Sequence, residues 1–166
     1  MRWQDAIRDD LEVHRIAVGK QGAKSFFAVA SLSDAATAQC RGGRLQDGVR
    51  SSGNAYDAAR AAFGPDAALT QAVGFTLAEC LIQAKDLGRA SRLLADVRPD
   101  AVAQLAADPH WGANLALAKA RIAWARRDLT EARRQLAQAS ALKDGKTDPY
   151  QRRAYLDLEK VVQAGG

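Results

Sequence analysis

The feature that most constrains the fold is an internal repeat of 42 residues. Residues 86–90 and 128–132 both read Asp-Leu-x-x-Ala and lie 42 positions apart. The same interval leads back from Leu87 to Leu45 and then to Trp3, each followed three positions later by a small residue. A period of this length, carried by large-small pairs, is typical of stacked helical hairpins.

A second series of small residues supports the same period. Ala36, Ala78 and Ala120 are spaced by 42 residues and precede the first series by one helix. Small side chains let two helices approach closely where they cross. We therefore expect Ala90 and Ala132 to lie where the two helices of a hairpin nearly touch.

Composition favours helices throughout. The hydrophobic share is 48% but the aromatic share is only 6%, and the apolar mass comes from Ala and Leu, which prefer helices to strands. The pattern predicts an all-α fold, an α-solenoid of about three antiparallel hairpins with a leading half-repeat and a C-terminal capping helix. Helices are expected near 3–18, 24–40, 45–62, 66–84, 87–97, 100–107, 112–126, 129–142 and 149–163.

In each expected hairpin the large-small pair lies on the second helix. The first pair, Trp3 and Ala6, therefore marks the second helix of a hairpin, and the first helix of that hairpin is not in the sequence. We therefore expect one repeat domain over residues 1–166 that belongs to a longer protein.

The chain resembles tetratricopeptide repeats, through the small residues at the hairpin crossings and the final helix that acts as a lid. The spacing and the linking segment 62–70 are similar to the longer-period variety found in kinesin light chains and bacterial signalling proteins. The resemblance is strong from Ala55 to Leu142. It implies a module that binds a protein or peptide, as the sensory or regulatory part of a bacterial signalling protein or transcriptional regulator. A structural self-association module, forming a homo-oligomer, is the alternative.

Two binding modes of the family lack their residues here. Kinesin-light-chain-like repeats carry paired Asn before the first-helix Ala, whereas this chain has Phe-Thr-Leu at 75–77 and Ser-Asp-Ala at 33–35. Chaperone-tail-binding repeats use cations on the first helices to clamp a terminal carboxylate, but Ser33, Thr37 and Thr76 are uncharged. We expect neither an Asn ladder nor a carboxylate clamp on the first helices.

By this resemblance, the first helix of each hairpin lines the binding groove. Aromatic residues supply much of the energy at interfaces, so Phe75 and Trp124 are candidate anchors, the alternative being that both only pack between helices. The candidate groove comprises Asp34, Thr37, Arg41, Phe75, Thr76, Glu79, Gln83, Asn114, Arg121 and Trp124.

No motif points to catalysis, a cofactor or a metal. Cys40 and Cys80 have no CxxC spacing and are expected to be small buried hydrophobes, with a disulfide as the alternative in an oxidising compartment. His14 and His110 lie on different elements with no nucleophile at readable spacing, so a hydrolytic triad has no support. We expect no enzyme.

Nucleic acids and membranes are not expected partners. Residues 19–25 lack the spacing of a phosphate-binding loop, and acidic residues interrupt the basic stretch at 121–134. No apolar run approaches the roughly 20 residues that span a bilayer, and a formal charge of +5 is modest. The expected compartment is the cytoplasm, or the periplasm if the parent protein is anchored in a membrane.

Overall fold

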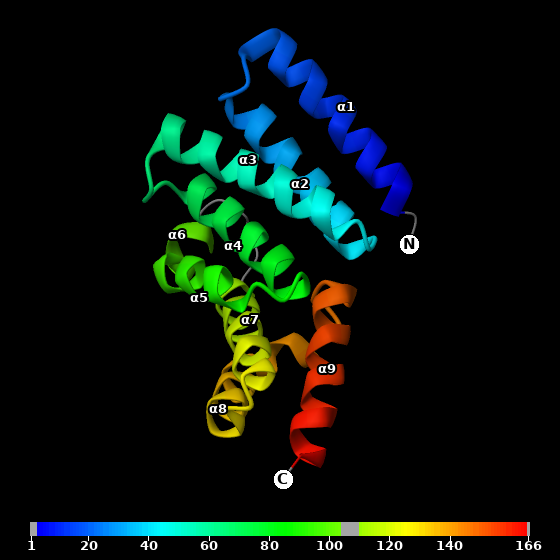
Figure 1. Cartoon of the computed structure of the whole chain (residues 1–166), viewed down its shortest axis with the longest axis vertical. Helices are drawn as coiled ribbons and strands as arrows, with labels where there is room; N and C mark the ends of the chain where they lie inside the picture. The colour runs from blue at the N-terminus through cyan, green and yellow to red at the C-terminus, as the bar shows by residue number, and fades with distance from the viewer. Residues whose placement is uncertain (1–2, 104–109, 166) are drawn as a thin grey trace. The chain divides into compact units, whose positions relative to one another are not determined.

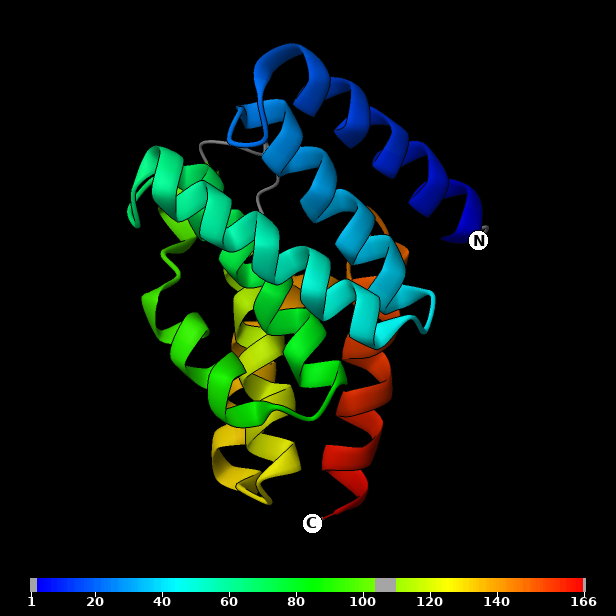
Figure 2. The same ribbon diagram turned by 45° about the horizontal axis from the view of Figure 1, so that its top comes forward.

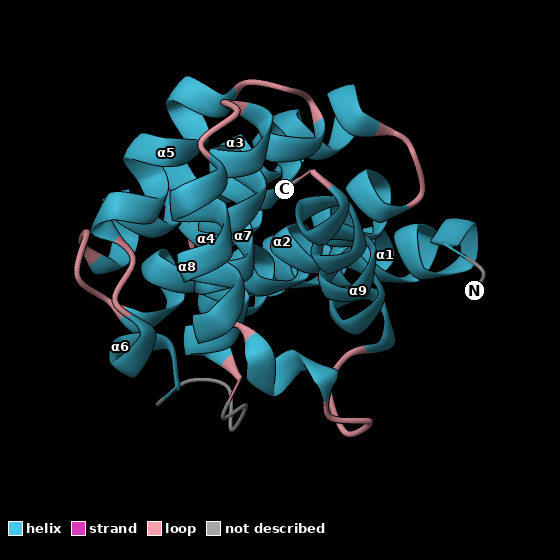
Figure 3. Cartoon of the chain, turned by 90° about the horizontal axis from the view of Figure 1, so that it is seen from below, coloured by secondary structure: helices cyan, strands magenta, loops and turns pink. Residues whose placement is uncertain are grey.

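The computed structural model describes residues 3–103 and 110–165, and within them it contains helices and loops but no strand (Figure 3). An all-α fold is therefore confirmed. The chain divides into two compact units, Met1–Leu105 and Ala106–Gly166.

The first unit is a run of antiparallel helices in which each of the first four packs on the next, whereas the short sixth helix packs on the fourth (Figures 1 and 2). The helix α2 also packs on α4, whereas no Cα atom of α3 lies within 8 Å of one in α5, both helices being described in full. The first helices of successive hairpins thus touch while their second helices stand apart. The helices are α1 (Trp3–Gln21), α2 (Phe26–Arg41), α3 (Leu45–Phe63), α4 (Ala68–Gln83), α5 (Leu87–Asp96) and the short α6 (Pro99–Ala103).

The second unit is one hairpin closed by a final helix. It contains α7 (Trp111–Ala125), α8 (Leu129–Gln138), the 3-10 helix η1 (Ser140–Lys143) and α9 (Pro149–Ala164). Tyr155 and Val162 of α9 pack into the same core as Ala120 and Ala132 of the hairpin. Asp148 starts α9 by accepting a hydrogen bond at its side chain from the Tyr150 amide, with Pro149 at the first helical position.

The small residues of the repeat lie at the helix crossings, as predicted. Ala36, Ala78, Ala90, Ala120 and Ala132 are all 0% exposed. Of the two remaining positions, Ala6 is half-buried. At the other, a Cβ atom added to Gly48 would overlap Sγ of Cys40 and lie 3.2 Å from the Ala36 carbonyl oxygen. Only glycine fits there, because α2 and α3 cross with no room for a side chain.

The turn inside each hairpin also follows the 42-residue interval. Gly43, Lys85 and Arg127 all have positive φ, at 85°, 66° and 64°. The amide after each one donates to a carbonyl five residues back, from Arg44 to Gln39, Asp86 to Leu81 and Asp128 to Ala123. This is the left-handed helix ending that glycine favours, and two of the three turns adopt it without glycine.

The predicted helix boundaries agree with the observed ones to within a few residues, with one correction. The helix expected over 129–142 ends at Gln138, and the chain continues as η1, whose Leu142 is fully buried. The helix expected over 100–107 is observed as Pro99–Ala103, and its remaining positions lie outside the described residues.

Candidate functional site

Six of the ten predicted groove residues lie together on the two first helices of the first unit. Three come from α2 and three from α4, at positions 42 residues apart, and these helices pack on each other. Asp34 is exposed and the others are half-buried. The six are Asp34, Thr37, Arg41, Thr76, Glu79 and Gln83.

Two bridges hold α2 against α4 beneath this face. Ser33 Oγ donates a hydrogen bond to Thr76 Oγ1 at 3.3 Å. Cys40 and Cys80 form a disulfide whose Cα atoms are 5.6 Å apart, and both residues are buried. Both cysteines are buried as expected, and of the two alternatives that the sequence left open, a free thiol or a disulfide, the structure contains the disulfide. Helices linked at two points present their polar side chains in a fixed arrangement.

The acidic end of this face has a perturbed carboxyl group. Asp34 is exposed by surface area, yet the protein packed around it, and then the nearby carboxylate of Asp10, raise its pKa. Burial and the neighbouring Asp9 likewise raise the pKa of Asp10. Both shifts oppose ionisation, so a cationic group placed here would relieve them.

The other four predicted groove residues comprise one in the first unit and three in the second unit. Phe75 is on α4 but only 4% exposed. It therefore lies in the interior, in agreement with the alternative that it only packs between helices. Asn114, Arg121 and Trp124 belong to α7 in the second unit, where Asn114 is buried and the other two are half-buried. Trp124 and Leu129 line a hollow of about 510 Å³ next to Gly165.

A second concave feature, which the sequence did not predict, lies between α3 and α5. This outer groove has a volume of about 310 Å³. Its floor includes Leu77 of α4, and the guanidinium of Arg60 lies 5.7 Å from the centre of the Tyr56 ring. The residues that line it are Gly53, Tyr56, Asp57, Arg60, Leu77, Arg89, Arg92, Leu93 and Asp96.

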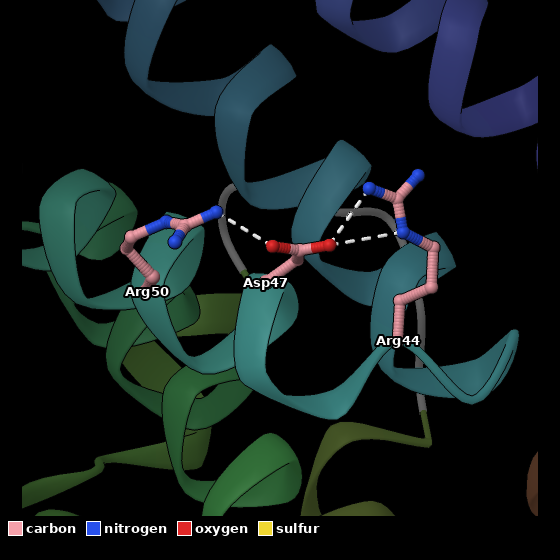
Figure 4. Close-up of polar contacts among 3 residues, drawn as sticks. All are labelled: Arg44, Asp47 and Arg50. Carbon is pink, nitrogen blue, oxygen red and sulfur yellow. Dashed lines mark hydrogen bonds and ion pairs between the residues drawn. The ribbon is translucent and has the colours of Figure 1, made fainter.

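The second helix of a hairpin carries ion pairs on its solvent-facing side, as α3 and α8 show. At the start of α3, Asp47 accepts from Arg44 Nη2 at 2.7 Å and from Arg50 Nη2 at 2.6 Å (Figure 4). Arg44 and then Arg50 hold the pKa of Asp47 below its usual range. On α8, hydrogen bonds from Arg134 and then Gln135 lower the pKa of Glu131 to about 2. These are solvated pairs of modest strength.

Within the part of the chain that the structure describes, the histidines and other metal-ligating side chains form no metal-binding cluster. His14 Nδ1 lies 2.8 Å from the Ala28 carbonyl oxygen, and in the Nδ1–H tautomer it donates a hydrogen bond to that oxygen. His110 belongs to the second unit and comes directly before α7. Among residues 3–103 and 110–165, no three His, Cys, Asp or Glu side chains are placed to hold a metal ion. Over the same residues, none of the helices combines the length and the apolar character needed to cross a bilayer.

Comparison with known proteins gives no relatives to draw on. No protein-family model, no curated protein and no solved structure matches the chain.

Proposed function

We propose that this chain is a protein-interaction module, built as an α-solenoid of the tetratricopeptide kind. The observation that carries the proposal is the polar face on α2 and α4. Those helices bury most of their surface, yet positions 34, 37, 41, 76, 79 and 83 stay at least partly accessible. Partly accessible polar residues in register on two linked helices are suited to binding an extended segment of a partner.

The solenoid part of the proposal is supported by the 42-residue recurrence of left-handed turns and small-residue crossings. It is also supported by the contact between α2 and α4, with α3 and α5 apart. Repeated units that touch along one side only stack into a curved array.

A regulatory role in a bacterial signalling protein rests on the resemblance to tetratricopeptide repeats alone. The structure also supports a proposal about the compartment in which the protein works. Disulfides persist in oxidising environments and are rare in the cytosol, so the bond between Cys40 and Cys80 favours the periplasmic alternative over the cytoplasmic one.

Selection from a displayed library of random peptides tests the interaction proposal. Selected peptides should lose affinity for Glu79→Arg or Thr37→Arg, which change the polar face, and keep it for Gln46→Arg. Gln46 is a matched control because it is exposed on α3 and lines neither the polar face nor the outer groove. A library that yields no specific binder to the folded chain would contradict the proposal.

Self-association is the second candidate function, and one observation favours it. Large apolar side chains are exposed near the α1–α2 end of the first unit, with Phe27 the most exposed at 60%. The others there are Leu11, Val13, Ile16 and Phe26. The helix α1 also carries the solvated ion pairs Arg8–Asp5 and Arg15–Glu12, which suit a face in water.

Sedimentation velocity across a hundredfold concentration range separates the candidates. Self-association predicts that the wild-type chain forms a dimer and that the Phe27→Ser variant is a monomer. A monomer at every concentration would remove this alternative.

A further inference from the structure

The second helices share a repeated arginine that has an acidic partner in three of four cases. Arg8, Arg50, Arg92 and Arg134 are spaced by 42 residues. Three residues before each stand Asp5, Asp47, Arg89 and Glu131. The pairs Arg8–Asp5, Arg50–Asp47 and Arg134–Glu131 are formed at 3.3, 2.6 and 2.6 Å.

The exception is α5, where the acid is replaced by Arg89. Arg89 turns to Asp86, the residue that caps the helix, at 3.6 Å. Arg92 is left without an ion pair among the described residues, although the same register position is paired on α1, α3 and α8. Two cations three positions apart on a helix repel each other, so this exchange weakens α5.

A second departure occurs at the neighbouring position. The register that holds Gln4, Gln46 and Thr130 holds Gly88 in α5. Gly88 is the second residue of α5, and glycine favours the helical conformation less than Gln or Thr does. A Cβ at Gly88 would lie 3.9 Å from Arg92 Nη1, an ordinary van der Waals contact, so glycine leaves this side of the guanidinium uncovered. Both departures expose Arg92, and neither improves the helix.

Both arginines line the outer groove. It opens because α2 and α4 pack together while α3 and α5 do not approach each other. Arg60 of α3 stands on the other side of the groove, above Tyr56, and Leu77 and Leu93 supply apolar surface. The helix α5, whose arginine at this register position lacks the acidic partner found on α1, α3 and α8, therefore borders a hollow of about 310 Å³.

We propose that the outer groove binds an acidic segment of a partner protein, with one carboxylate held by Arg92 and Arg89 and an adjacent apolar side chain on Leu77, Leu93 and Tyr56. This rests on the proposed function, since it assigns partner chemistry to an interaction module. Guanidinium groups match carboxylates by paired N–H donors.

The charge of the groove favours a carboxylate over a phosphate. Three arginines and two aspartates, Asp57 and Asp96, line it, which leaves one net positive charge. A single carboxylate balances that charge, whereas a phosphate monoester would bring close to two negative charges near both aspartates. The site also differs from the carboxylate clamp of chaperone-binding repeats, because it lies on second helices.

The test is an array of immobilised peptides in matched sets, each containing Glu, Gln or phosphoserine at one position beside Leu or Phe. Wild-type protein should bind the Glu form of some sets and not the Gln form. Arg92→Gln should weaken that binding roughly tenfold to a hundredfold. Arg50→Gln, the same register position outside the groove, should leave it unchanged.

The sharpest variant is Arg89→Glu, which restores the acid of the other second helices. It should pair with Arg92 and abolish peptide binding although Arg92 is still present, and circular dichroism should show an intact fold. Binding of Glu peptides that survives Arg92→Gln and Arg89→Glu would overturn the site.

Three further outcomes are decisive. Preference for phosphoserine over Glu would overturn the carboxylate assignment. Peptides that respond to Glu79→Arg but not to Arg92→Gln would preserve the interaction module and overturn this groove, whereas binding of no peptide would overturn both.

Discussion

Breaking the disulfide between Cys40 and Cys80 should destabilise the first unit substantially. The bond joins α2 to α4 across a sequence separation of 40 residues. A cross-link stabilises mainly by restricting the unfolded chain, and the loss of loop entropy grows with the logarithm of loop length. For this separation the expected contribution is about 4 kcal/mol at 25 °C.

Urea unfolding with and without excess reductant measures this contribution on one protein. Trp3 is a suitable probe, because its side chain lies against Gly42, next to the end of α2, and Trp111 and Trp124 can be replaced by Phe. With a denaturant slope of roughly 2 kcal/mol/M, reduction should lower the midpoint by about 2 M.

The double variant Cys40→Ala/Cys80→Ala is the control, since its midpoint should not respond to reductant. Mass spectrometry of the unreduced protein should find no free thiol. A midpoint that reductant leaves unchanged in the wild-type chain, or alkylation of both cysteines in native protein, would refute the cross-link and with it the argument for an oxidising compartment.

Three other perturbations test the repeat. Ala132→Glu should lower the free energy of unfolding by roughly 3 kcal/mol or more, because it buries an unpaired charge at a 0%-exposed crossing. The control Ala137→Glu, on the exposed face of α8, should change the urea midpoint little. Equal effects of the two substitutions would refute the register. Lys85→Gly should raise stability by about 1 kcal/mol, because φ is 66° there, and a lower melting temperature would contradict the left-handed turn. Glu131 should titrate at about 2, so its folded-state pKa lies below the ordinary 4.5 and its contribution to stability, present above that value, is lost as the pH falls towards 2. Carboxyl NMR should show Arg134→Gln returning the pKa towards 4.5, and a wild-type value near 4.5 would contradict the pairing.

The helices and their crossings could be predicted from the sequence because both depend on local chemistry repeated in register. Ala36, Ala90 and Ala132 are small for a steric reason that the 42-residue interval reveals. Short polar turns at residues 85–86 and 127–128 could also be predicted, but not the left-handed conformation of Lys85 and Arg127, because among the three turns only Gly43 carries the usual glycine signal.

The sequence register predicted six polar positions that share a face on α2 and α4, and the role of this face in binding stays a prediction. Register identifies which positions of α2 and α4 stay accessible, but it does not distinguish Phe75 from its neighbours, since burial depends on the packing of several helices. The disulfide was undecided for a similar reason. The separation of 40 residues is close to one repeat, yet pairing requires α2 and α4 to pack side by side.

The outer groove was missed although its signal is in the sequence. Aligning residues 5, 47, 89 and 131 shows the single Arg among acids. The exchange of an acid for Arg89 does not by itself predict a binding groove. The groove exists because α3 and α5 do not contact each other, and the sequence does not reveal that separation.

Nuclear Overhauser effects at the predicted crossings test the stacked-hairpin account most directly. Contacts should join Ala36 to Gly48, Ala78 to Ala90 and Ala120 to Ala132, three pairs that each span twelve residues and recur every 42. Observation of all three is the predicted result, methyl to methyl for the two alanine pairs and from the Ala36 methyl to the Hα protons of Gly48. Absence of these cross-peaks in a folded, helical chain would contradict the repeat and everything inferred from its register.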